Sequence, residues 1–130
     1  MKKLKLRDDQ CIHYQHRIPI YGVQLHVLRA NDFAPAWDVL FADLPVAGDP
    51  RAYGCHWFDA ATNTAYVGLQ TCANAATIAH EALHLTHAIL HNIGHKADYR
   101  NDEPTCYLLG YLVLQLTPGK GEKKINYPKP

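Results

Sequence analysis

Residues 74–94 read NAATIAHEALHLTHAILHNIG, and this stretch decides the fold. Asn74 is a good N-cap residue and Gly94 a good C′ residue, with neither Pro nor Gly between them, so the sequence predicts one helix over Ala75–Ile93. One stripe of this helix is apolar, with residues recurring at spacings of three and four, and should face the core. That stripe consists of Ile78, Ala82, Leu85, Ile89 and Ile93.

A metal-binding pattern, His-Glu-x-x-His, occupies residues 80–84 of the same helix. Positions i and i+4 lie one above the other on a helix, so His80 and His84 can bind one metal ion. Glu81 lies about 100° round the helix, where it can reach a water molecule at that metal. From the counts of His and Glu, the pattern is expected by chance only about 0.01 times in this chain. The run therefore predicts two zinc ligands and a general base.

Two further histidines, His87 and His91, continue the polar stripe. They lie one and two turns beyond His84, and His91 is too far from a metal centred between His80 and His84 to coordinate it. The sequence allows two interpretations of His87 and His91: a solvated helix face or a surface that binds a partner.

Upstream of the helix, Ala52–Phe58 and Ala65–Gln70 are strand-like, and residues 59–64 between them are rich in turn-forming residues. This order predicts a β-hairpin that leads directly into the metal helix. A strand beside that helix could bind an extended peptide by edge pairing. The alternative is a purely structural hairpin.

The N-terminal part is predicted less completely. Alternation of apolar residues indicates a strand over Tyr21–Leu28, and Asn31-Asp32 can cap a short helix over Phe33–Ala42. Leu44–Arg51, with two prolines and a glycine, is expected to be a loop, residues 1–9 a basic arm, and Gln10–Ile20 shows no clear pattern.

Downstream, a second amphipathic helix is expected to begin after Asp102 and to continue to Leu116, with Pro104 in its first turn. If the chain folds back after the first helix, the Glu103 carboxylate could lie over the face of His80 and His84 and act as the third zinc ligand. Asp102 is the alternative candidate for this ligand. Residues 1–118 thus form one domain, and the lysine-rich residues 119–130 are expected to be a disordered tail.

Composition fits an ordinary α+β domain. The 130 residues are 48% hydrophobic and 19% charged, and the net charge of +1 gives no reason to expect nucleic acid. The apolar runs are too short for a membrane span, and no signal peptide is evident, so a cytoplasmic protein is expected. The four cysteines form no Cys-x-x-Cys pair and are expected to be small buried residues.

The motif residues resemble a known enzyme family. The run from His80 to His84, followed by Asn101-Asp102-Glu103 and by residues 107–112 (YLLGYL), looks like a minimal form of the gluzincin pattern of thermolysin-like zinc metallopeptidases. It is also similar to small metallopeptidase-like proteins encoded by phages and prophages. The resemblance implies that His80, His84 and Glu103 bind Zn²⁺ and that Glu81 activates water.

One position departs from the family. Thermolysin-like enzymes place an Asp four residues after the ligand Glu, and Tyr107 stands there in this chain. Tyr107 could donate a hydrogen bond to the oxyanion of peptide hydrolysis or could simply pack between the helices.

The expected fold is therefore a small antiparallel or mixed sheet whose β-hairpin packs on the His-Glu-x-x-His helix, with a second C-terminal helix. Three functions fit this chain: a zinc peptidase that cleaves a narrow range of peptides or proteins, a peptidase-like zinc protein that acts by binding a protein, as a phage effector would, and a metal-free interaction module. If a phage encodes it, the expected location is the host cytoplasm. The sequence carries no signal for the oligomeric state.

Overall fold

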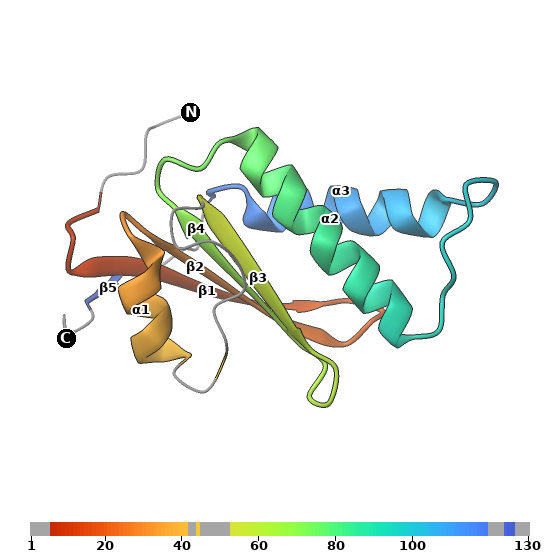
Figure 1. The fold of residues 1–130 in the computed structure, drawn as a ribbon, viewed down its shortest axis with the longest axis horizontal. Helices are drawn as coiled ribbons and strands as arrows, with labels where there is room; N and C mark the ends of the chain where they lie inside the picture. The colour runs from red at the N-terminus through yellow and green to blue at the C-terminus, as the bar shows by residue number, and fades with distance from the viewer. Residues whose placement is uncertain (1–5, 42–43, 45–52, 120–123, 127–130) are drawn as a thin grey trace.

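The computed structural model describes residues 6–41, 44, 53–119 and 124–126. Its eight elements form a mixed α+β domain, which confirms the predicted class (Figure 1). In chain order they are β1 (Gln10–Ile18), β2 (Val23–Ala30), α1 (Phe33–Leu40), β3 (Gly54–Asp59), β4 (Thr64–Gln70), α2 (Ala75–Asn92), α3 (Glu103–Leu116) and β5 (Lys124–Asn126).

The five strands form one sheet in the order β3-β4-β2-β1-β5. Strands β2 and β4 are parallel, and the other neighbours are antiparallel. The hairpin predicted before the His-Glu-x-x-His helix is present as β3 and β4, which pair from Gly54↔Leu69 to Asp59↔Thr64. As a result, β3 lies at the edge of the sheet and contacts α2.

Helices cover both faces of the sheet. Successive side chains of a strand point to opposite sides, so each face has side chains against which a helix can pack. Helices α2 and α3 pack on one face, where Leu25, Val67 and Leu69 join Leu85 and Ile89 of α2 in a single buried cluster. On the opposite face a second cluster forms around α1. Figure 1 shows α2 and α3 crossing beside the sheet, with α1 near its other end.

Close approach of α1 to the sheet depends on Gly68 of β4. A Cβ atom at this position would lie 2.9 Å from Phe33 and 3.1 Å from Trp37, both fully buried side chains of α1. Next to this contact, His13 of β1 and His26 of β2 share a hydrogen bond of 2.9 Å between Nε2 and Nδ1. The ring of His26 also stacks on Tyr66, so the α1 face carries a half-buried aromatic cluster.

Helix α2 begins at the predicted residue and ends one residue before the predicted end. The Asn74 side chain accepts a hydrogen bond of 3.1 Å from the backbone N–H of Thr77, and Gly94 follows the helix with φ of 80°. The predicted apolar stripe is buried except for Ile93, which is 56% exposed because the helix ends at Asn92. Helix α3 has Asp102 at its N-cap position, but the Asp102 side chain makes no capping hydrogen bond.

Two strands were not predicted from the sequence. Gln10–Ile18, which showed no clear pattern, is the nine-residue strand β1. Within the tail, the short segment Lys124–Asn126 pairs with Gln10–Ile12 and satisfies the outer backbone groups of β1. Several predicted segments lie outside the described residues: residues 1–5 of the basic arm, residues 45–51 of the loop, and residues 120–123 and 127–130 of the tail.

The cysteine prediction is half right. Cys11 and Cys55 are buried, and burial raises their thiol pKa values to about 11 and about 12. Cys72 and Cys106 are instead exposed, and all four cysteines are free thiols.

Among the helices that the structure describes, none combines the length and the hydropathy needed to cross a lipid bilayer.

Candidate metal centre

The two histidines of the His-Glu-x-x-His motif come together on the exposed side of α2. The Nε2 atoms of His80 and His84 lie 3.2 Å apart, and the two rings meet edge to face at an angle of 74°. Residues four apart lie on one face of a helix, so the two side chains are neighbours, and their ring orientations bring the two Nε2 atoms together.

This distance fits two ligands of one zinc ion. Two nitrogens at about 2.0–2.1 Å from a tetrahedral metal are separated by roughly 3.3 Å. The pKa of His84 is also lowered, mainly by partial desolvation and to a smaller extent by the neighbouring His56. A lowered pKa favours the neutral imidazole, which is the form that binds metals.

Glu81 occupies a different environment from the two histidines. It lies at the α2–β3 contact and is 5% exposed, whereas His80 and His84 are exposed. Gly54 of β3 makes this approach possible, since a Cβ atom there would lie 3.1 Å from Cγ of Glu81. The predicted base is therefore held against the edge strand.

His56 of β3 is the partner of Glu81. Its Nδ1 lies 2.8 Å from Oε2 of Glu81, and its ring stacks on that of His84 with centroids 4.4 Å apart and planes inclined by 15°. The sequence reasoning missed His56. A signal was present, because Gly54, His56 and Phe58 alternate along the first strand of the hairpin, β3, and so share one face of it.

Glu103 and Tyr107 lie elsewhere. They line a pocket of about 660 Å³ between the start of α3 and the turn after β1, together with Ile20 and Tyr21. Tyr107 is 76% exposed there, and none of His80, Glu81 and His84 lines this pocket. In the described part of the chain, no three His, Cys, Asp or Glu side chains are grouped to bind a metal, so Glu103 is not brought together with the histidine pair.

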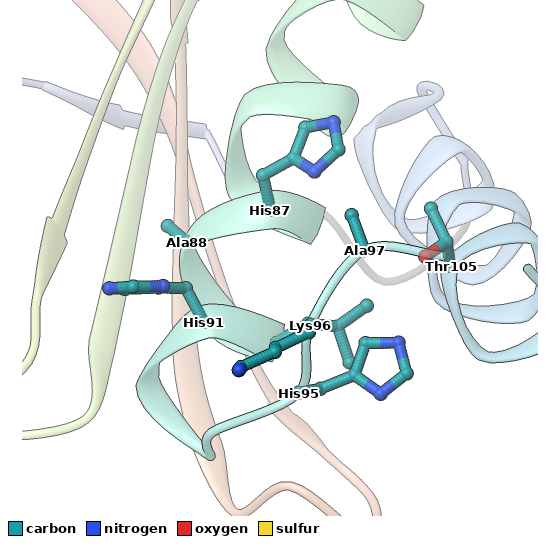
Figure 2. A pocket seen from close by; sticks show the side chains of 8 residues that line it. His87, Ala88, His91, His95, Lys96, Ala97 and Thr105 are labelled. Atoms are coloured by element: carbon teal, nitrogen blue, oxygen red, sulfur yellow. The ribbon is translucent and has the colours of Figure 1, made fainter. Parts of the chain in front are cut away.

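His87 and His91 differ from the first pair. Figure 2 shows their rings pointing in different directions, with His87 on the side of Thr105 and His91 on the other side. Both line a pocket of about 560 Å³ with His95 and Lys96, and Nε2 of His95 is buried with no hydrogen-bond partner among the described residues. The i,i+4 spacing alone thus does not produce convergent nitrogens in this helix.

Comparison with known proteins gives no match to any family model, any curated protein or any solved structure.

Proposed function

We propose that this protein is a zinc-dependent metallopeptidase that hydrolyses peptide bonds in a narrow range of peptide or protein substrates. The observation that carries the proposal is the 3.2 Å separation of the two motif Nε2 atoms, with the Glu81 carboxylate fixed between the same helix and the edge strand. This combination provides two metal-ligand atoms next to a base.

The proposal assigns zinc to His80, His84 and Glu103. The first two already face each other, whereas Glu103 lines the pocket beside Ile20 and would have to move from it towards the pair. Zinc bound there would supply Lewis acidity to a substrate carbonyl and to water. The third ligand therefore rests on the resemblance to gluzincins and on the sequence spacing.

Glu81 is the general base in this proposal. It takes a proton from the water that attacks the carbonyl carbon, and it passes this proton to the amine nitrogen when the C–N bond breaks. One carboxylate oxygen accepts from His56, which leaves the second oxygen for the water. Tyr107, 76% exposed in the pocket of Glu103, would have to accompany α3 to reach an oxyanion.

Strand β3 provides the proposed peptide-binding edge. Among the described residues only β4 pairs with β3, so the outer backbone groups of β3 can bind an extended substrate next to Glu81. Main-chain pairing of this kind places a scissile bond beside the helix independently of most side chains.

Zinc content and hydrolysis test the proposal together. Wild-type protein should contain one zinc per chain, and His80→Ala or His84→Ala should lose it, since two remaining ligands do not retain the ion against a chelator. Glu81→Gln should keep the zinc but lose cleavage of a proteome-derived peptide library read by mass spectrometry. His91→Ala is the matched control and should keep both. Full zinc occupancy in His80→Ala would refute the assignment.

A second function is favoured by the exposed apolar side chains around the pocket of Glu103. Ile20 is 98% exposed and Tyr107 76% exposed, a pairing suited to a protein partner. The alternative is thus a peptidase-like zinc protein, such as a phage effector, that acts by binding a protein without hydrolysis. It predicts zinc in both wild type and Glu81→Gln, and no cleavage in either. A cytoplasmic location, in the host cell if a phage encodes the chain, belongs to both proposals.

A further inference from the structure

His56 is the one histidine near the motif that no sequence pattern assigned, and its ring is held from two sides. Nδ1 lies 2.8 Å from Oε2 of Glu81, while the ring face covers the ring of His84. The His56 side chain is 29% exposed and that of Glu81 only 7%. Few water molecules can therefore replace His56 as the partner of this carboxylate.

The hydrogen bond defines the tautomer of His56. A carboxylate only accepts hydrogen bonds, so Nδ1 of His56 carries a proton and donates a hydrogen bond to Glu81. In the singly protonated ring, Nε2 then has a lone pair. A histidine with a free Nε2 lone pair beside two metal ligands could itself be a third ligand, and ring geometry decides this point.

Ring geometry argues against a common metal for His56 and His84. An imidazole binds a metal in the plane of its ring. The planes of His56 and His84 are inclined by only 15° and their centroids are 4.4 Å apart, so one ion close to both rings cannot lie in both ring planes. The rings of His80 and His84 meet at 74°, and their nitrogens converge. His56 is therefore suited to act on Glu81 and not on the ion.

We propose that His56 is a positioning residue for the general base: its Nδ1–H fixes the Glu81 carboxylate against β3, beside the edge on which the substrate would pair. This inference rests on the proposed metallopeptidase function. Gly54 supports it from the same strand face, because it leaves room for Cγ of Glu81 against the backbone. Strand β3 thus holds both the base and, in this proposal, the peptide, so their relative position is set by one element.

Two substitutions separate the hydrogen bond from the bulk of the ring. In His56→Asn the side-chain amide can donate from nearly the position of Nδ1, whereas His56→Leu fills the space without a donor. We expect His56→Leu to lower kcat on the peptide library about tenfold or more, with KM and zinc content unchanged, as is typical for loss of an outer hydrogen-bond partner. His56→Asn should recover most of this loss.

A second measurement is independent of activity. Two-bond ¹H–¹⁵N correlation spectra of the zinc-free protein report which ring nitrogen of His56 carries the proton. We expect the Nδ1–H form in wild type and its loss in Glu81→Ala. The Nε2–H form in wild type would overturn the proposal, and so would equal kcat values in His56→Asn and His56→Leu.

The remaining outcomes distinguish this inference from the proposed function. Zinc loss in His56→Leu would make His56 a ligand and would overturn the positioning role while leaving a metal centre. Zinc-loaded wild type that cleaves nothing in the library would remove the peptidase function and this role with it. An active wild type with unaltered His56→Leu would refute the positioning role alone.

Discussion

Glu103 is the residue at which sequence spacing and described geometry differ most. It follows His84 by 19 residues, a spacing at which a fold-back of the chain could bring its carboxylate over the histidine pair, yet its side chain lines the pocket beside Ile20 and Tyr107. We expect Glu103→Ala to lower zinc affinity at least tenfold, because a catalytic zinc keeps three protein ligands. Titration with zinc against a competing chelator measures this change.

Asp102→Ala is the matched control for Glu103. The two side chains diverge by about 100° at the helix start, so Asp102→Ala should change zinc affinity by no more than a few-fold. Unchanged affinity in Glu103→Ala, with loss in Asp102→Ala, would assign the third ligand to Asp102 and exclude the gluzincin pattern.

His26 should make stability depend on pH. Its pKa is lowered from 6.5 to about 4, mainly by burial and to a smaller extent by the charge of His13. The unfolded chain therefore takes up a proton that the folded protein does not, and the free energy of unfolding should fall as the pH drops from about 6.5 towards 4. Because the ring is partly exposed to solvent, we expect a loss of about 1–3 kcal/mol.

Urea unfolding at several pH values measures this loss, and His26→Gln serves as the control. The variant removes the titrating ring while leaving His13, whose pKa burial also lowers. Its unfolding free energy should decline less than that of wild type over the same window. An identical decline in both proteins would show that His26 is not the group responsible.

The N-termini of α2 and α3 differ in their capping hydrogen bonds and can be compared within one protein. The Asn74 side chain accepts from the backbone N–H of Thr77, whereas Asp102 makes no side-chain capping bond. Asn74→Ala should therefore destabilise the fold by about 1 kcal/mol, and Asp102→Ala by much less. Thermal or urea unfolding of the two variants tests this difference, and equal destabilisation would contradict it.

Local sequence signals account for the elements that were predicted. Helix α2 follows from its cap, its C′ glycine and its apolar stripe, and the β3–β4 hairpin follows from strand-like runs around a turn. Strand β1 was missed because its inner face mixes Ile12 and Ile18 with Tyr14 and His16, which weakens the alternation of apolar and polar residues. Strand β5 has only three residues and exists through its pairing with β1, which no local pattern reveals.

At the scale of the whole molecule, the proximity of His80 and His84 could be predicted from the sequence, whereas the residues around them could not. His80 and His84 both belong to α2, and their i,i+4 spacing puts them on one face of it. The contact of His56 with Glu81 requires the sheet order, which puts β3 at the edge, and the inner face of β3, which carries Gly54 and His56 towards α2. The position of Glu103 likewise depends on how the connection after α2 directs α3.

The exposed histidines of α2 also affect how the protein must be prepared. Two pairs, His80 with His84 and His87 with His91, lie at helical spacing on the exposed surface, and imidazole pairs bind immobilised nickel. Untagged protein should be retained on a nickel resin, and nickel leached from that resin would compete for the very nitrogens that zinc is proposed to occupy. Metal content is therefore best measured on protein purified by ion exchange and gel filtration alone, with buffers stripped of trace metals.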